Sequence, residues 1–189
     1  MAEFTEQGFA RASTNAIVKA AGIGKGMLFY YFGSKEELFD FLCEYAMESP
    51  VAFLRELHFD SGDFLERYMI MAEGKRRTLH SQPLIIRFFE SLYRPENAAH
   101  LEKYGPRLQS LRQEMFDKLY TGLDYSLLRD NITPEKAIEY MKWLLERYEH
   151  DLTEQFKTGE MQEISPEALQ GEWDRYYAFL ADLRKIFYK

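Results

Sequence analysis

The sequence predicts an all-α protein, and three observations support that prediction. Apolar residues recur at steps of three and four in most segments, which is the spacing of one helix face. Only six prolines and eleven glycines occur in 189 residues, fewer than many short strands and tight turns would need. Several segments also open with a hydroxyl residue beside a proline or an acid, which is typical of a helix start.

Composition limits the kind of protein further. Hydrophobic residues make up 46% of the chain, enough to bury a sizeable core, and the single cysteine, Cys43, excludes an internal disulfide. No apolar run approaches the roughly 18 residues of a membrane span, and no signal peptide opens the sequence. The net charge of −7 argues against general coating of DNA or of an anionic membrane. We therefore expect a cytoplasmic protein that makes no membrane contact.

The first distinctive stretch is Ser13–Lys35, which predicts two short helices joined by a tight turn. Ser13 or its neighbour Thr14 provides a hydroxyl that can cap the first helix, and Gly22 provides a left-handed end. A second helix follows and ends at Gly33, and a capping serine then opens a third. This order is typical of a helix-turn-helix, whose second helix enters the major groove of DNA.

Local charge favours the same interpretation. The stretch from Gln7 to Lys35 carries four basic residues and no acid, whereas Glu36 to Glu48 carries five acids and no base. A surface that docks on a polyanion should be basic locally, even in an acidic protein. Charge alone leaves open that this is an ordinary helical segment, but its coincidence with the helix-turn-helix pattern favours DNA binding.

The run AAGIGKGMLFYYFGSKEELF, Ala20 to Phe39, resembles the N-terminal DNA-binding domain of TetR-family transcriptional regulators. The preceding segment, Glu3 to Thr14, resembles the end of that domain's first helix, so this helix is expected to be shortened. The resemblance implies a three-helix helix-turn-helix DNA-binding domain over residues 1–46. Residues 47–189 would then form an α-helical effector-binding and dimerisation domain.

By this resemblance, eight residues form the docking surface for double-stranded DNA. They are Thr14, Lys25, Gly26, Met27, Phe29, Tyr30, Tyr31 and Lys35. Hydroxyl and ammonium groups among them suit phosphate contacts, and Met27 suits a thymine methyl group. Three positions depart from the commonest family pattern, since Gly24, Met27 and Phe29 each lack the hydroxyl that the family usually carries there. We therefore expect fewer polar contacts to DNA.

Later helices are predicted from periodicity alone. A helix from Lys35 should reach the region of Glu48 and be bent or interrupted by Pro50. Further helices are expected over residues 64–79, 82–93 and 98–123, the last bent at Gly105-Pro106.

Two more helices should begin at Thr133-Pro134 and Ser165-Pro166, each a hydroxyl cap followed by proline. Both carry apolar stripes, and the resemblance implies that these form a homodimer interface. The residues are Met141, Leu144, Tyr148, Leu152, Trp173, Tyr176, Leu180 and Phe187. The same stripes could pack within one subunit. A protein that binds palindromic DNA needs two DNA-binding domains, which favours the dimer.

Aromatic and methionine side chains populate the middle helices, where the resemblance implies a cavity for a small-molecule effector. The candidates are Tyr68, Met71, Phe88, Phe89, Tyr93, Tyr104, Phe116, Tyr120 and Trp143. Such a lining suits an apolar or aromatic ligand, although an ordinary packed core uses the same residue types.

No catalytic, metal or cofactor site is predicted. A phosphate loop would need glycine at 19 and a hydroxyl at 26, where the chain has Lys19 and Gly26. The four histidines are scattered, and Glu146 with His150 is an isolated helical pair. The overall interpretation is a ligand-responsive transcriptional repressor that leaves a palindromic operator on binding an effector. Two alternatives stay open: a helical binding or interaction module with a decayed DNA-binding head, and an all-helical enzyme.

Overall fold

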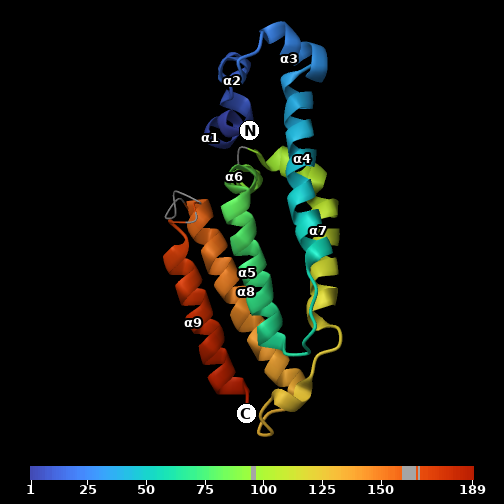
Figure 1. Ribbon diagram of the computed structural model, residues 1–189, viewed down its shortest axis with the longest axis vertical. Helices are drawn as coiled ribbons and strands as arrows, with labels where there is room; N and C mark the ends of the chain where they lie inside the picture. Colours follow the sequence, from blue (N-terminus) through green and yellow to red (C-terminus); the bar gives the residue numbers. More distant parts are fainter. Residues whose placement is uncertain (95–96, 159–164, 166) are drawn as a thin grey trace. The chain divides into compact units, whose positions relative to one another are not determined.

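The computed structural model describes residues 1–94, 97–158, 165 and 167–189, and its regular elements within these ranges are helices (Figure 1). They are α1 (Ala2–Arg11), α2 (Thr14–Ala21), α3 (Lys25–Phe32), α4 (Lys35–Glu56), α5 (Phe64–Ser81), α6 (Pro83–Ser91), α7 (Ala98–Tyr120), α8 (Pro134–Thr158) and α9 (Gln170–Phe187). A short 3-10 turn spans Tyr125–Leu127. The predicted all-α class is confirmed. None of the described helices is long and apolar enough to span a membrane.

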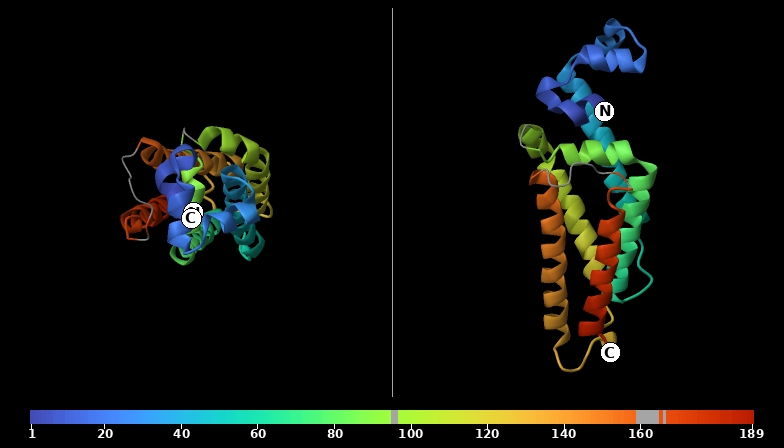
Figure 2. Two further views of the ribbon diagram at one scale, coloured as in Figure 1. Left: turned by 90° about the horizontal axis from the view of Figure 1, so that it is seen from above. Right: turned by 90° about the vertical axis from the view of Figure 1, so that its left-hand side faces the viewer.

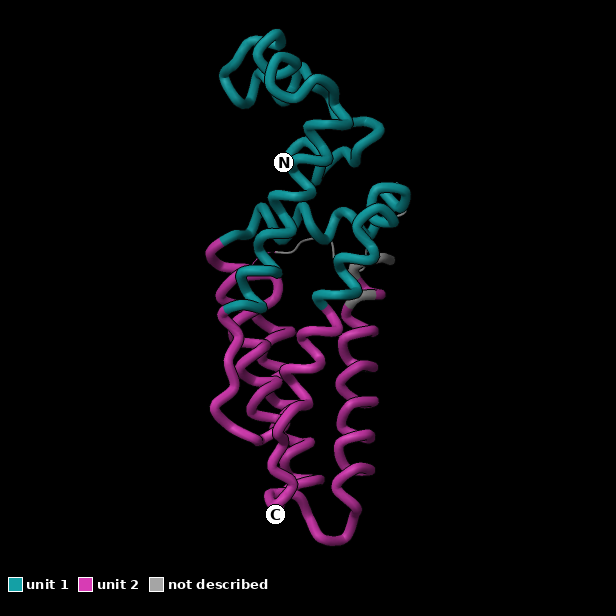
Figure 3. Tube along the Cα trace, turned by 90° about the vertical axis from the view of Figure 1, so that its right-hand side faces the viewer, with its two compact units in different colours: residues 1–55, 82–111 teal, residues 56–81, 112–189 magenta. Residues whose placement is uncertain are grey.

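The chain divides into two compact units that interleave along the sequence (Figure 3). Unit 1 contains residues 1–55 and 82–111, and unit 2 contains residues 56–81 and 112–189. Within unit 2, the long helices α8 and α9 lie side by side (Figure 2), and Tyr148 of α8 packs against the Tyr176 and Phe179 rings of α9.

The predicted boundaries of the first helices are confirmed. The Oγ of Ser13 accepts a hydrogen bond from the N–H of Ala16 at 3.3 Å, which caps α2. Gly22 ends α2 in the left-handed conformation, at φ 67° and ψ 26°. The Oγ of Ser34 accepts from the N–H of Glu37 at 3.0 Å and opens α4.

The later boundaries differ in part from prediction. Helix α4 continues through Pro50 to Glu56, and α7 continues through Pro106 to Tyr120. A proline inside a helix removes one backbone hydrogen bond, and packing of the helix face on both sides of the proline offsets that loss. Helix α8 begins at Pro134 as expected, whereas α9 begins at Gln170 and not after Ser165; Pro166 lies outside the described residues.

Each unit has its own apolar core. The core of unit 1 joins the first four helices to α6 and the start of α7, through Phe4, Ala12, Val18, Leu28, Leu38, Phe39, Cys43, Ala46, Phe88, Leu92 and Tyr104. The large buried side chains of unit 2 include Phe64, Leu65, Tyr68, Met71, Leu119, Met141 and Leu145. The three helices of the N-terminal head are therefore packed on later parts of the chain as well as on one another.

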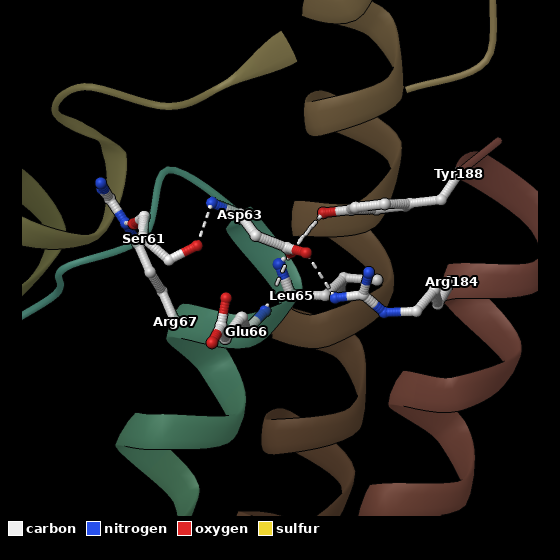
Figure 4. A network of polar contacts seen from close by, with 7 residues as sticks. All are labelled: Ser61, Asp63, Leu65, Glu66, Arg67, Arg184 and Tyr188. Carbon is white, nitrogen blue, oxygen red and sulfur yellow. Dashed lines mark hydrogen bonds and ion pairs between the residues drawn. The ribbon is translucent and has the colours of Figure 1, made fainter. Parts of the chain in front are cut away.

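Two buried polar groups tie unit 2 together. The Asp63 carboxylate accepts hydrogen bonds from Arg184 at 2.6 Å and from the Tyr188 hydroxyl at 2.9 Å (Figure 4). It also caps α5 by accepting from the N–H of Glu66 at 3.0 Å. Burial raises the pKa of the Asp63 carboxyl, but these hydrogen bonds outweigh that effect and hold it below its usual value.

The second group is the guanidinium of Arg67, whose residue is 5% exposed. It donates to the carbonyl of Ser61 and to those of Lys118, Leu119, Thr121 and Gly122 at the end of α7. Carbonyl groups at a helix C-terminus lack partners within the helix, so a cation placed there satisfies them. Arg67 therefore fixes the start of α5 to the end of α7.

Candidate DNA-binding surface

Helix α3 is short and mostly exposed, which is unusual for a segment so rich in apolar and aromatic residues. Of its eight residues only Leu28 is buried, at 2% exposure, and it belongs to the core of unit 1. Met27, Tyr30 and Tyr31 are 50%, 81% and 69% exposed. Large side chains of this kind, left in solvent on one short helix, indicate a surface that contacts another molecule.

Exposed side chains of α3 lie close to one another in two pairs. The Tyr30 and Tyr31 rings are 5.2 Å apart in an edge-to-face arrangement. The Lys25 ammonium lies 5.9 Å from the centre of the Phe29 ring, and Phe29 is itself 37% exposed. The structure thus brings six of the eight predicted DNA-contact residues together on α3, with hydroxyl and ammonium groups that suit phosphate oxygens.

Two glycines at the start of α3, Gly24 and Gly26, leave its backbone without side chains there. A Cβ added at Gly24 or Gly26 would meet no other atom of the chain within 4 Å. Gly24 is the N-cap and has an ordinary extended conformation, at φ −75° and ψ 147°. The chain's own packing therefore does not require glycine at either position, and the backbone of α3 is open to close approach from outside.

The two remaining predicted contacts lie on neighbouring helices. Thr14 is half-buried in the first turn of α2, directly after the capping Ser13. Lys35 is half-buried in the first turn of α4, where its Nζ donates to the carbonyl of Ala10 at 3.1 Å and lies 4.9 Å from the Phe9 ring centre. The structure thus turns Lys35 toward α1, an internal role that the sequence pattern did not reveal.

The acidic run that follows the head is partly neutralised within unit 1. Lys103 of α7 contacts the Asp40 carboxylate at 2.6 Å, and Arg107 contacts both Glu44 and Glu48. Exposed pairs of this kind add little stability, roughly 0–1 kcal/mol each. Their effect here is to reduce the negative charge of α4 behind the basic head.

The nine predicted effector residues are divided between the two units. Phe88, Phe89, Tyr93 and Tyr104 belong to unit 1, and Tyr68, Met71, Phe116, Tyr120 and Trp143 belong to unit 2. Phe88 and Tyr104 lie in the core of unit 1, while Tyr93 and Trp143 are exposed.

The group in unit 2 combines aromatic rings with polar tips. The Tyr68 and Tyr120 hydroxyls are hydrogen-bonded at 3.2 Å, and the Lys142 ammonium lies 5.6 Å from the Tyr120 ring centre. Burial raises the pKa of the Tyr120 hydroxyl. The Tyr68–Tyr120 pair therefore stays protonated at neutral pH and can donate or accept a hydrogen bond.

The predicted dimer residues differ in exposure. Four are buried inside unit 2: Met141, Tyr176, Leu180 and Phe187. Tyr148, Leu152 and Trp173 are partly buried, and Leu144 is 44% exposed. Beside Leu144 on α8 lie two further exposed aromatic residues, Tyr140 and Trp143, whose rings are 5.7 Å apart. Tyr140 is not among the predicted dimer residues, although its position one turn before Leu144 places it on the same helix face.

No cluster of three or more His, Cys, Asp or Glu that could hold a metal occurs within the ranges described above. Glu146, which could have joined His150 as a ligand, contacts Lys142 at 3.8 Å.

Comparison with known proteins agrees with the geometry of the head. Residues 1–42 match the family of bacterial regulatory proteins described as the tetR family. The ketosteroid transcriptional regulator KstR2 of Mycobacterium tuberculosis has a similar fold, with a TM-score of 0.57 and 16% identity over 100% of this chain and 90% of that one. A putative transcriptional regulator from Streptomyces coelicolor, SCO4942, gives a TM-score of 0.47 and 20% identity over 98% and 92% of the two chains.

No curated protein matches the chain. The matched family is one of bacterial regulatory proteins. The family match falls on the segment that contains α3 and its exposed side chains, and the fold of the chain is similar to that of a solved regulator. The first 42 residues therefore match the N-terminal domain of the tetR family of bacterial regulatory proteins, and the chain is similar in fold to a solved transcriptional regulator.

Proposed function

We propose that the protein is a ligand-responsive repressor that binds a palindromic operator as a homodimer and leaves it when a small effector binds. The observation that carries this proposal is the exposure of Met27, Tyr30 and Tyr31 on a short helix that begins with Lys25. Helix α3 would lie in the major groove, with Met27 near base edges and the tyrosine hydroxyls at phosphates. Thr14, Gly26 and Phe29 complete this surface.

A homodimer supplies the second reading head. We place the dimer contact on α8 and α9, over the predicted residues Met141, Leu144, Tyr148, Leu152, Trp173, Tyr176, Leu180 and Phe187. Its accessible centre is Leu144 with Tyr140 and Trp143, because these apolar side chains remain exposed on a long helix. Two heads joined in this way would read half-sites about 34–36 Å apart.

The effector would be a small apolar or aromatic molecule. Support comes from the aromatic residues of the middle helices, with the Tyr68 and Tyr120 hydroxyls available to orient a polar group of the ligand. KstR2 is described as a ketosteroid regulator, but at 16% identity that likeness shows the fold and gives no ligand for this chain. The protein leaves the operator if the ligand binds more tightly to a conformation whose two DNA-binding domains are wrongly spaced for DNA. The loss of DNA affinity can be no larger than this difference in ligand affinity between the two conformations.

Functionally we divide the chain at residue 46. Residues 1–46 would contact DNA, and residues 47–189 would bind the effector and the second subunit, in the cytoplasm. The compact units do not coincide with this division, because unit 1 adds residues 82–111 to the head. That arrangement suits a regulator, since a segment outside the DNA-binding residues is packed directly on them.

Selection from a random duplex library tests the proposal. The protein is incubated with the library at moderate salt, and the retained duplexes are sequenced. We expect an inverted repeat, and we expect Met27→Ala to change the preferred bases while leaving the half-site separation unchanged. If the wild-type chain is confirmed to be folded and still retains no particular sequence, the proposal of a repressor is overturned.

A second function is favoured by one observation. Gly24, Met27 and Phe29 each lack a hydroxyl that the family usually carries, so α3 offers few polar groups to DNA. A helical protein with a decayed head, acting as a small-molecule-binding or interaction module, would show this loss. Such a protein would enrich no duplex, and the substitution of Met27 or Tyr31 would change no measured property apart from stability.

A further inference from the structure

Helix α1 is broken at Gly8, and the break determines what its neighbours can contact. Gly8 has φ 70° and ψ 167°, a conformation that is essentially restricted to glycine. In an unbroken α-helix the N–H of Phe9 would donate to the carbonyl of Thr5. Rotation of the backbone at Gly8 separates these two groups. Thr5 is buried and Phe9 is half-buried, so leaving their backbone groups unpaired would be costly.

Both separated groups find partners on the connection between α6 and α7. The N–H of Phe9 donates to Oδ1 of Asn97 at 3.2 Å, and Nη1 of Arg94 donates to the carbonyl of Thr5 at 2.9 Å. The Phe9 N–H and the Thr5 carbonyl thus each have a tertiary partner in place of one another. We call Arg94 and Asn97 together the α1 clasp.

The orientation of Asn97 is itself fixed. Its residue is fully buried, and its Nδ2 donates to the carbonyl of Ser91 at 2.8 Å. With the amide nitrogen occupied in this way, the amide oxygen must face Phe9. The α1 clasp thus places an acceptor, Oδ1 of Asn97, and a donor, Nη1 of Arg94, where a bent α1 needs them. A straight α1 would form neither hydrogen bond.

The bend is transmitted to the reading helix by two further contacts. Oε1 of Glu3 accepts from the N–H of Ser13 at 2.9 Å, and Ser13 is the residue that caps α2. Ten residues of unbroken helix would cover about 15 Å, which is beyond the reach of a glutamate side chain. On the other side of the break, Lys35 donates to the carbonyl of Ala10 and so connects α1 to the start of α4.

We propose that Arg94 and Asn97 are positioning residues for DNA recognition. They hold α1 in its bent form, and the bent α1 sets the orientation of α2 and α3 through Glu3, Ser13 and Lys35. The inference rests on the proposed DNA binding and adds to it the segment of the later chain that aims the head. Neither Arg94 nor Asn97 contacts DNA in this proposal, so they alter where the two heads point and leave the bases that each head reads unchanged.

The first test is a double-mutant cycle between Gly8→Ala and Asn97→Ala, read by thermal unfolding and needing no DNA. Alanine at residue 8 opposes the bend, so it should lower the melting temperature of the wild-type chain by several degrees. In the Asn97→Ala chain the same substitution should cost at most half as much, because nothing there holds the bend. Equal losses in both backgrounds would overturn the clasp. Gln7→Ala, an exposed change on the same helix, should have the same effect in both.

The second test reads orientation, which a purely structural role would not change. Duplexes are selected from one random library with the wild-type chain and with Arg94→Ala, an exposed position that should fold even if Asn97→Ala does not. We expect the same half-site bases, with either a changed spacer between half-sites or an affinity at the wild-type spacer reduced about tenfold. Arg94→Lys, which retains a donor, should restore most of the affinity.

The outcomes separate the two proposals. If the wild-type chain selects an inverted repeat and Arg94→Ala selects the same repeat, spacer and affinity, this inference is overturned and the repressor stands. If the wild-type chain selects no sequence, the repressor is overturned, and the role of the clasp in DNA recognition is overturned with it.

Discussion

Lys35 donates a hydrogen bond from Nζ to the carbonyl oxygen of Ala10, at 3.1 Å, and its ammonium also lies over the Phe9 ring. The family resemblance implied a phosphate contact for this lysine. In the structure its side chain joins the start of α4 to the end of α1. Lys25 is the exposed lysine at the start of α3 itself.

We therefore expect Lys25→Ala and Lys35→Ala to differ in a measurable way. Lys25→Ala should weaken binding to all duplexes and reduce the slope of log affinity against log salt by about 1. Lys35→Ala should lower the thermal stability of the head and change that slope less. Affinity measured over a series of salt concentrations for the two variants decides this, and a larger loss of slope for Lys35→Ala would return that lysine to the DNA surface.

Arg67 should contribute strongly to the stability of unit 2. Arg67→Met keeps most of the apolar volume but removes every donor to the carbonyls of Ser61 and of the end of α7. Leaving these buried acceptors unpaired should reduce the free energy of unfolding by about 2 kcal/mol or more. Urea unfolding should show a lower midpoint with an unchanged slope. Arg112→Met, an exposed arginine of α7, is the matched control, and an equal loss there would contradict the expectation.

Asp63 should make stability depend on pH in the acid range. Hydrogen bonds from the Glu66 N–H, Arg184 and Tyr188 hold its pKa below the usual value, despite burial. The native state therefore binds this proton less readily than the unfolded chain, in which the pKa is about 3.9. The stabilisation is fully present above that pH and is lost as the pH falls through the lower, native pKa.

Asp63→Asn isolates this contribution. At neutral pH the variant should be less stable by about 1–3 kcal/mol, and the difference from wild type should shrink as the pH falls below about 4. Urea unfolding of both chains at several pH values measures it. Asp130→Asn removes an exposed carboxylate that pairs with Lys189 and should have almost no effect at any pH. A pH-independent difference for Asp63→Asn would contradict the role assigned to its ionisation.

Leu144 should control the oligomeric state if α8 is the dimer contact. Leu144→Asp places a charge on an exposed apolar position, so it should leave the folded subunit intact and dissociate the dimer. Sedimentation velocity of the variant should show a monomer where the wild type shows a dimer. Glu139→Ala, another exposed change on α8, is the control. A dimer that persists in Leu144→Asp would place the interface elsewhere.

The parts of the fold that were predictable rest on local signals. The helix ends were predicted correctly at Ser13, Gly22 and Ser34. A helix cap or a left-handed helix end depends on the residue itself and its immediate neighbours, so the local sequence is enough. The break of α1 at Gly8 was not predictable, since its two compensating partners are 88 and 89 residues away in the sequence. Nothing near Gly8 distinguishes a glycine that breaks a helix from one that a helix tolerates.

The candidate site divides in the same way. The exposed face of α3 follows from its own sequence, because one buried residue, Leu28, suffices to orient so short a helix. The sequence of α8 does not show which residues of its apolar stripe are buried. Met141 is fully buried and Leu144 is 44% exposed, although both fit the same helical spacing. Which of them is covered depends on where α5 and α9 pack, and that is decided by the whole of unit 2.

The interleaving of the two units has a consequence for the order in which the protein is made. The head of unit 1 is synthesised first, yet Phe88, Leu92 and Tyr104 of its core emerge from the ribosome only after the first stretch of unit 2. Unit 2 in turn cannot be complete until Tyr188 has been synthesised, because its hydroxyl accepts a hydrogen bond from the N–H of Leu65 and donates one to Asp63. Nascent chains halted before residue 111 should therefore expose the head's apolar core to chaperones and proteases, however well its first helices form.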